Sequence, residues 1–330
     1  MKYKWDLIGH FKQRTYLQKQ IESGKISHAY VFVGLKNLGK FKLAKQFANI
    51  ILCNGKDEKK PCGKCINCRQ FKKNIHPHFH IIEPLKNRKT QNIGIEQVRS
   101  IIKELSRKSF GNSWQIVIIR QAHNINIQAA NAILKTLEEP GKKQIIILLA
   151  ENFNSLPLTI ISRCQIIKFL PVAKKDIFVA LKKDIYDESQ LETLCRLANG
   201  LPLVMQDFFT KKNKLVDYEE LIQWTLSLLE KNNCTAKLKM FEIKYKKIEA
   251  TQAVNLINTW ISLWRDLLLQ KNNQADLIIN YFANQKIQAV SEKYSNSKIN
   301  NMISLLEKTR SQSVNKNYKL WFENLIINNL

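Results

Sequence analysis

Short apolar runs alternate with stretches of helical spacing in the first half of the chain. Five of these runs have the length of buried strands, and they cover residues 30–33, 79–82, 116–119, 145–149 and 166–169. Between them, apolar side chains recur every three or four positions, as at Ile95, Val98, Ile102 and Leu105. Strands that alternate with helices predict an α/β domain whose five strands form a parallel, doubly wound sheet.

The strand pattern stops near residue 170, and a helical pattern takes its place. Residues 172–207 predict short helices that end near Asn199–Pro202, a linker is expected at 211–214, and helical spacing then continues. Two apolar stripes mark the later helices: Ile257, Trp260, Ile261, Trp264, Leu267 and Leu268, and then Val314, Tyr318, Trp321 and Leu325. We interpret the stripes as the core of an all-α bundle; the alternative is a surface that packs on partner subunits.

The composition is that of a soluble globular protein. The 330 residues suffice for two or three domains, and 45% of them are hydrophobic and 24% charged. The longest apolar runs, such as residues 145–150, are too short to span a bilayer. Asp6 follows Lys2 and Lys4 where a signal peptide needs its apolar segment. We therefore predict neither secretion nor a membrane partner.

The net charge is strongly positive and unevenly distributed. The chain carries 53 Lys and Arg against 27 Asp and Glu, a net charge of +26. Residues 1–170 contribute 30 basic and 10 acidic side chains, whereas residues 171–330 contribute 23 and 17. This excess favours a polyanionic partner, most commonly nucleic acid. A bias toward Lys and Asn without binding meaning is the alternative, because a total charge does not locate a patch.

Four of the seven cysteines are clustered. Cys62, Cys65 and Cys68 form two overlapping C-x-x-C steps, and Cys53 lies just upstream. Four thiolates can complete a tetrahedral zinc shell, and the two-residue spacing lets neighbouring sulfurs reach one metal. A redox pair needs only two cysteines, and disulfides are rare in chains that are not secreted. We predict a structural Zn²⁺ site with no open position for catalysis.

The remaining histidines and cysteines carry weaker signals. His76, His78 and His80 alternate before an apolar run and could bind a metal on one strand face. We interpret them instead as surface residues that lead into a strand, because the cysteine site is already complete. Cys195 and Cys234 are expected to be buried free thiols.

The first predicted strand runs into a phosphate-loop frame. Gly34, Gly39 and Lys40 match the pattern G-x-x-x-x-G-K, and a helical stretch follows. Glycines let backbone N–H groups turn toward phosphate, and the lysine could reach the terminal phosphates. Phe41, however, stands where Ser or Thr should hold Mg²⁺. We therefore expect binding of ATP or ADP at this loop to be weak or absent.

A second part of an ATPase site is also missing. The apolar run 114–119 is followed by Arg120 and Gln121, where an ATPase carries Asp and Glu. An arginine repels Mg²⁺, and an amide cannot act as a general base. We predict a nucleotide-binding fold that has lost hydrolysis; a working ATPase is the alternative, and residual phosphate affinity through Lys40 stays open.

Several further short motifs are distributed along residues 27–164. They are Ser27–Tyr30 before the loop, the four cysteines, His76-Pro77, Ile95–Arg99, Ala129–Pro140, Leu156-Pro157 and Ser162-Arg163-Cys164. Together these motifs resemble those of the delta-prime subunits of bacterial DNA polymerase III clamp loaders, which are AAA+ proteins. The sequence departs from the family pattern at His78, where Asp is usual.

The resemblance implies an organisation into three domains. An AAA+ five-stranded sheet domain would span residues 1–170, with a zinc module inserted at about 53–68. A small helical lid would follow at 171–209, and a helical collar that oligomerises with other subunits would span 210–330.

The resemblance also implies a function. A five-subunit clamp loader uses ATP to open a sliding clamp and place it on primed DNA. A delta-prime subunit does not hydrolyse ATP; it assembles with gamma or tau motor subunits and with delta, in the bacterial cytoplasm at the nucleoid. Its Ser162-Arg163-Cys164 motif would lend Arg163 as an arginine finger to a neighbouring ATP site. Without the motif, Arg163 would be interpreted as part of a surface ion pair.

Two other functions remain open from the sequence. One is an ATP-hydrolysing motor subunit of the gamma or tau type in the same loader, which would share the zinc module and the Ser-Arg-Cys motif. The other is a stand-alone zinc-containing protein that binds nucleic acid through its basic N-terminal half, with an affinity that falls steeply with salt.

Overall fold

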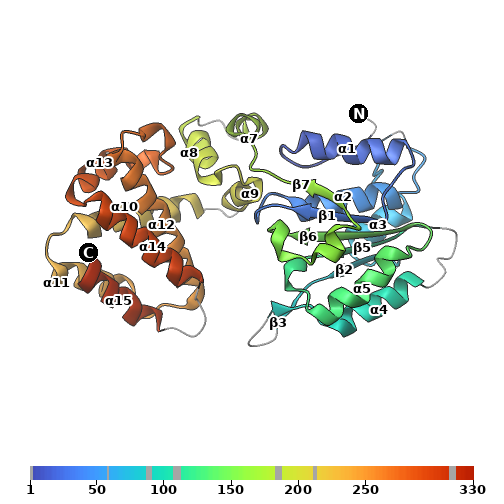
Figure 1. The fold of residues 1–330 in the computed structure, drawn as a ribbon. Coiled ribbons are helices and arrows are strands. Elements are labelled where there is room, and N and C mark those ends of the chain that lie inside the picture. The colour runs from blue at the N-terminus through green and yellow to red at the C-terminus, as the bar shows by residue number, and fades with distance from the viewer. Residues whose placement is uncertain are drawn as a thin grey trace. The chain divides into compact units, whose positions relative to one another are not determined.

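The computed structural model describes residues 3–57, 59–86, 91–106, 113–182, 188–210, 214–311 and 317–330. The chain divides into two compact units, each described by itself below (Figure 1). The α/β unit comprises the residues up to Ala180 together with Gly200–Leu203, and the helical unit comprises Leu181–Asn199 and Val204–Leu330. The predicted boundaries of a separate lid, at 171 and 209, stay a prediction.

A five-stranded parallel sheet forms the centre of the α/β unit, as the sequence predicts. Its order is β2-β5-β6-β1-β7, with β1 at Ala29–Val33, β2 at Phe79–Ile82, β5 at Gln115–Ile119, β6 at Gln144–Ala150 and β7 at Gln165–Lys168. Val31 lies opposite Leu148 of β6 and Ile166 of β7. All residues of β1 and β5 are buried, which explains why these strands are continuous apolar runs.

Helices cover both faces of this sheet (Figure 1). One face packs against α1 (Phe11–Glu22), α2 (Lys40–Leu52) and α3 (Ile66–Lys72). The other packs against α4 (Ile95–Ser106), α5 (Ile127–Glu138) and the short α6 (Leu158–Ile161). Side chains alternate between these layers, so that Tyr30 and Phe32 join the first core and Val31 the second.

Smaller elements complete the α/β unit. They are the hairpin of β3 (Leu85–Lys86) and β4 (Gln91–Asn92), two 3₁₀ turns at Ala122–Asn124 and Phe153–Ser155, and α7 (Lys174–Leu181), which begins in this unit.

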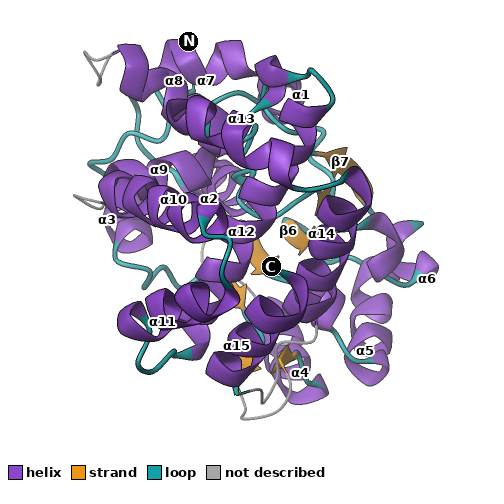
Figure 2. Cartoon of the chain, turned by 90° about the vertical axis from the view of Figure 1, so that its left-hand side faces the viewer, coloured by secondary structure: helices purple, strands orange, loops and turns teal. Residues whose placement is uncertain are grey.

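The described residues of the helical unit contain helices and no strand. Figure 2 draws these helices in purple. The helices are α8 (Glu188–Ala198), α9 (Pro202–Thr210, which starts in the α/β unit), α10 (Lys214–Glu230), α11 (Cys234–Lys244), α12 (Ala250–Lys271), α13 (Asn284–Lys293), α14 (Asn296–Ser311) and α15 (Tyr318–Asn329). Two 3₁₀ turns lie at Ala275–Leu277 and Tyr281–Ala283. In the expected linker, residues 211–213 lie outside the described residues, and Lys214 begins α10.

The central helix α12 organises the core of this unit. It packs against α13 and α14, and Trp260 and Trp264 are fully buried. Tyr318 and Leu325 of α15 are buried in the same core, whereas Val314 lies outside the described residues. The interpretation of the apolar stripes as core is confirmed for these four side chains.

A buried polar cluster joins α12 to the segment before α13. The carboxylate of Asp266, which has no exposed surface, accepts hydrogen bonds from the backbone N–H groups of Ile279 (3.0 Å) and Asn280 (2.8 Å). The Asn280 side-chain amide donates a third bond at 2.7 Å, and its oxygen accepts one from the Tyr218 hydroxyl. Because a buried charge without partners is unstable, this cluster needs all its members.

No helix in the described part of the chain is long and apolar enough to cross a bilayer.

Candidate functional site

The loop between β1 and α2 has the strand–loop–helix geometry of a phosphate loop. Gly34 has φ 153°, and a Cβ there would lie 2.4 Å from the carbonyl oxygen of Phe169. Gly39 caps the N-terminus of α2 with φ 89°, and a Cβ there would lie 2.6 Å from the Cδ1 atom of Leu7. Neither position accepts a side chain without strain. Both glycines of the sequence frame are therefore required by the backbone.

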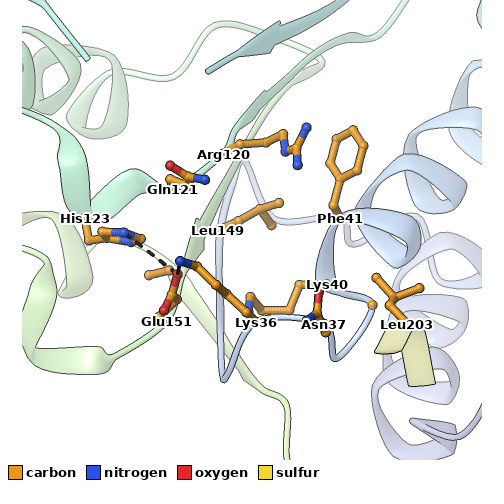
Figure 3. A pocket seen from close by; sticks show the side chains of 12 residues that line it. Lys36, Asn37, Lys40, Phe41, Arg120, Gln121, His123, Leu149, Glu151 and Leu203 are labelled. Atoms are coloured by element: carbon orange, nitrogen blue, oxygen red, sulfur yellow. Dashed lines mark ion pairs between the residues drawn. The ribbon is translucent and has the colours of Figure 1, made fainter. Parts of the chain in front are cut away.

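A pocket of about 230 Å³ lies beside this loop (Figure 3). Its described lining includes Lys40 and Phe41 from the start of α2, Arg120 after β5, and Glu151 after β6. It is smaller than the roughly 300–1,000 Å³ of ordinary small-molecule sites. The pocket lies at the carboxyl edge of the parallel strands, where α/β sheets usually bind ligands.

The lysine of the loop is bound to the loop itself. The Nζ atom of Lys40 donates to the carbonyl oxygens of Gly34 and Leu35, the latter at 2.6 Å. The residue is only 9% exposed, and burial lowers the pKa of its amine to about 8. The amine would have to leave these carbonyls before it could bind a terminal phosphate.

The two residues that depart from an ATPase pattern contact each other. The guanidinium of Arg120 lies beside the Phe41 ring (Figure 3), 4.4 Å from its centroid. The Nη1 atom of Arg120 pairs with the Glu83 carboxylate. A cation over an aromatic face contributes about 0.5–1 kcal/mol at exposed sites and more when desolvated. In a phosphate-loop ATPase, a hydroxyl and a carboxylate at these two positions hold Mg²⁺. Here an apolar ring and a cation occupy them.

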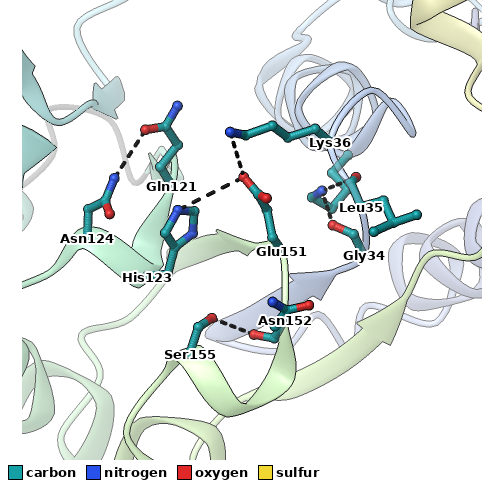
Figure 4. A network of polar contacts seen from close by, with 10 residues as sticks. Gly34, Leu35, Lys36, Gln121, His123, Asn124, Glu151, Asn152 and Ser155 are labelled. Atoms are coloured by element: carbon teal, nitrogen blue, oxygen red, sulfur yellow. Dashed lines mark hydrogen bonds and ion pairs between the residues drawn. The ribbon is translucent and has the colours of Figure 1, made fainter. Parts of the chain in front are cut away.

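Glu151 is the centre of a second set of polar contacts in the pocket (Figure 4). Its Oε1 atom lies 3.3 Å from Nζ of Lys36 and 4.0 Å from Nε2 of His123. Sequence reasoning missed Glu83, Glu151, Lys36 and His123. The signal for Glu83 and Glu151 was a polar position directly after an apolar strand, because such positions line the carboxyl edge of a parallel sheet; Lys36 and His123 lie further along the loops and had no such signal.

The four clustered cysteines meet in one place. Their Sγ atoms all lie within 4.8 Å of one another, and those of Cys62 and Cys68 are 3.9 Å apart. Four sulfurs around one zinc ion at 2.3 Å would be about 3.8 Å apart. A Cβ at Gly55 would lie 2.5 Å from Sγ of Cys62, so this glycine makes room for the cluster. The four residues can therefore hold a metal ion such as zinc.

Backbone amides and burial act differently on these thiols. The N–H groups of Cys65 and Lys64 donate to the Cys62 sulfur and lower the pKa of its thiol to about 6. Burial raises the pKa of Cys53 and Cys68. Metal ligation requires all four to lose their protons, so affinity would rise with pH.

Arg163 lies in the turn between α6 and β7, on the surface of the α/β unit. Its Nη2 atom is 2.8 Å from the Glu138 carboxylate, and Nη1 donates to the Thr159 carbonyl oxygen (2.9 Å) and the Ser162 hydroxyl (3.2 Å). The ion pair that the sequence offered as an alternative is therefore present. Cys164, the third motif residue, packs on the core beneath, and burial raises the pKa of its thiol to about 12.

The structure corrects part of the interpretation of the three histidines as surface residues. His76 is buried, not a surface residue: it is 4% exposed, its Nδ1 accepts from the His78 backbone N–H, and burial lowers its pKa to about 4. His78 and His80 are half-buried. In the described part of the chain, the cysteine cluster is the one group of three or more candidate ligands close enough to share an ion.

The two isolated cysteines of the helical unit differ in burial. Cys195 is buried, as predicted, whereas Cys234 is half-buried. The Sγ atom of Cys234 lies 3.9 Å from the backbone oxygen of Ile326, at the edge of the helical core.

Comparisons with known proteins agree with this architecture. A family model described as "DNA polymerase III, delta subunit" matches residues 9–173. The chain is 26% identical to DNA polymerase III subunit delta′ of Bacillus subtilis, over 99% of this chain and 98% of that protein. It is also 26% identical to DNA polymerase III subunit tau of the same organism, over 98% of this chain and 60% of that protein.

A solved structure shares the fold. It is a DNA polymerase III gamma subunit-related protein of Thermotoga maritima, with a TM-score of 0.51, 18% identity, and coverage of 89% of this chain and 99% of that one. The predicted fold class and the predicted resemblance are thus confirmed. Equal identity to a delta′ and a tau subunit means that similarity alone does not separate the two roles.

Proposed function

Because the chain belongs to the DNA polymerase III delta subunit family, we propose that it is the non-hydrolysing, delta-prime-type subunit of a clamp loader. In this role it assembles with gamma or tau motor subunits and a delta subunit. The complex places a sliding clamp on primed DNA, and this chain contacts the clamp and the DNA as part of that complex. It carries out no hydrolysis itself and assists hydrolysis in a neighbouring subunit.

The stack of Phe41 on Arg120 is the observation that carries the proposal. The ring and the guanidinium, 4.4 Å apart, occupy the two positions at which an ATPase supplies oxygen ligands for Mg²⁺, and the guanidinium adds a repelling charge there. Arg120 also pairs with the Glu83 carboxylate, so it has partners on two sides at this position. Gln121 next to it has an amide that cannot take a proton from water.

Lys40 supports the same conclusion. Its hydrogen bonds to two carbonyl oxygens of the loop satisfy the amine within the protein. A nucleotide would have to replace these bonds without help from Mg²⁺ bridging its phosphates. We expect the pocket to bind ATP or ADP weakly and without turnover.

Arg163 would act on a neighbour instead. The guanidinium is at the surface, and its ion pair with Glu138 joins side chains that are 37% and 49% exposed. Such pairs contribute about 0–1 kcal/mol, so the arginine is not needed for the stability of its own fold and its guanidinium stays accessible to a neighbour's γ-phosphate. Where measured in related reactions, an arginine finger raises the rate by about 10³–10⁵ because it stabilises charge that develops during phosphoryl transfer.

The cysteine cluster completes the proposal with a structural Zn²⁺ ion. Cys53, Cys62, Cys65 and Cys68 would hold it as thiolates, which fill every coordination position. The ion would hold together the segment around α3, which has few buried side chains of its own.

A motor subunit of the gamma or tau type is the second candidate. The similarity to a tau subunit over 98% of this chain favours it, and so does the retained Gly34-x-x-x-x-Gly39-Lys40 frame. It requires Phe41 and Arg120 to separate so that Mg²⁺ can enter.

Hydrolysis of Mg·ATP by the purified chain tests the proposal against this candidate. We expect no turnover by the chain alone, with or without primed DNA, because the Mg²⁺ ligands are missing. Steady turnover that disappears on Lys40→Met would assign the motor role.

A further inference from the structure

We propose that Glu138 is a positioning residue for Arg163: it holds the guanidinium in the orientation in which the arginine acts on the neighbouring subunit's ATP. This inference rests on the proposed arginine-finger function and extends it to a second residue. Glu138 itself touches neither the nucleotide nor the reacting water.

The carboxylate of Glu138 is anchored by the helix that carries it. Glu138 is the last residue of α5, and the residue before it, Leu137, is 2% exposed in the core beneath the sheet. Ile133, one turn earlier, is buried in the same core, and α5 packs against α6. The 2.8 Å contact therefore ties a flexible arginine to a fixed point of the α/β unit.

The remaining contacts of Arg163 determine which donors stay available. Nη1 donates to the Thr159 carbonyl oxygen and the Ser162 hydroxyl, and Nη2 forms the ion pair with Glu138. A guanidinium has five N–H donors. Among the described residues, the Nε–H makes no hydrogen bond and Nη2 meets only the Glu138 carboxylate. These two nitrogens are neighbours on the guanidinium and can meet two oxygens of one phosphate group.

The ion pair between Glu138 and Arg163 is not explained by a contribution to folding stability. Both side chains are well exposed, and exposed ion pairs add little to the stability of the fold. The ion pair instead restricts the rotamers of Arg163 before the neighbouring subunit's phosphate binds. Catalysis gains when such ordering is complete before the transition state forms.

The test is the ATPase of a reconstituted clamp loader with primed DNA and clamp, with kcat and KM for ATP measured separately. The variants are Glu138→Gln, Arg163→Ala, the double variant, and Glu139→Gln. Glu139 is the matched control, because this neighbouring acid, also among the described residues, makes no ion pair with Arg163. Glu138→Asp, which keeps the charge on a shorter side chain, is the second variant if Glu138→Gln assembles poorly.

We expect Glu138→Gln to lower kcat by about threefold to tenfold with KM nearly unchanged, since ordering one long side chain contributes on that scale. Glu138→Asp should retain part of the rate, and Glu139→Gln should match the unchanged protein. In the Arg163→Ala background, Glu138→Gln should have no further effect, because both act through one group.

Three results would overturn the positioning role. They are an unchanged or higher rate with Glu138→Gln while Arg163→Ala lowers it, an equal loss with Glu139→Gln, and independent, additive losses in the double variant. If Arg163→Ala itself leaves the rate unchanged, the arginine-finger function fails first, and the positioning role fails with it.

Discussion

The phosphate loop and the turn that carries Arg163 both belong to the α/β unit, but they treat their charged groups in opposite ways. At the loop, Lys40 is bonded to backbone carbonyls, and Arg120 is held between Phe41 and Glu83. At the turn, Arg163 is 37% exposed and keeps part of its donors free. The comparison teaches that one fold can bond the charged groups of a phosphate-loop frame within itself while it leaves another cation exposed at its surface.

The largest expected effect concerns the cysteine cluster. Its four thiols meet one another, just as the charged groups of the loop are bonded within the protein. Cys65→Ser should remove the metal and unfold the segment around α3, because ligation by four thiolates contributes on the order of 10 kcal/mol to folding. Metal analysis under reducing conditions should give about one Zn²⁺ per unchanged chain. Cys234→Ser, outside the cluster, should keep its zinc; an unchanged chain without zinc would contradict the assignment.

A buried charge in the helical unit gives the next largest effect. Asp266→Ala should lower the free energy of unfolding by about 3–5 kcal/mol, since it leaves the Asn280 side-chain amide and the backbone N–H groups of Ile279 and Asn280 without their acceptor. Denaturant titration of the full chain measures this change. Asp276→Ala, at an exposed carboxylate, is the control and should change stability by less than about 0.5 kcal/mol. Equal effects of the two would mean that the cluster adds no stability.

Placing Mg²⁺ ligands at the phosphate loop would make this region available to a ligand, as the turn with Arg163 already is. Phe41→Ser combined with Arg120→Asp should raise the affinity for Mg·ADP by about tenfold or more, because a hydroxyl and a carboxylate replace an apolar ring and a repelling cation. Calorimetric titration with and without Mg²⁺ measures the change. Phe41→Leu, which supplies no oxygen, should leave the affinity low. If the double variant gains nothing from Mg²⁺, the stack is not what excludes the ion.

The smallest expected effect is the pH dependence that His76 contributes. Burial lowers its folded pKa to about 4, whereas the unfolded value is about 6.5. Between these values the unfolded chain binds more protons, so the contribution is complete above pH 6.5 and is lost as the pH falls toward 4. The loss should be about 1–2 kcal/mol by pH 5, since one unit of pKa shift corresponds to about 1.4 kcal/mol.

Denaturant midpoints of the unchanged chain and of His76→Gln between pH 7 and pH 4.5 measure this contribution. The variant should lose less stability over that range. Parallel curves would show that His76 does not titrate with unfolding.

Much of the fold could be predicted from the sequence, and the reason is burial on both faces. The strands β1, β5 and β6 are enclosed by helices, so their sequences are continuous apolar runs with clear limits. The glycines of the loop and the spacing of the cysteines were equally readable, because each is required by local geometry.

The contacts of exposed polar residues could not be predicted in the same way. Arg120 meets Glu83 because β5 lies beside β2 in the sheet, and Arg163 meets Glu138 because α6 packs against α5. No periodicity marks such partners. His76 was misjudged because alternating polar residues before a strand usually lie at the surface, whereas this ring packs beside Phe71.

The ATPase of a loader reconstituted with either Lys40→Met or Arg163→Ala in this chain tests the central claim most directly. The account predicts that Lys40→Met leaves DNA-stimulated turnover unchanged, while Arg163→Ala removes the contribution of one finger, about 10³-fold at the ATP site it serves. A loader that loses turnover with Lys40→Met and keeps it with Arg163→Ala would contradict the account and make this chain a motor subunit.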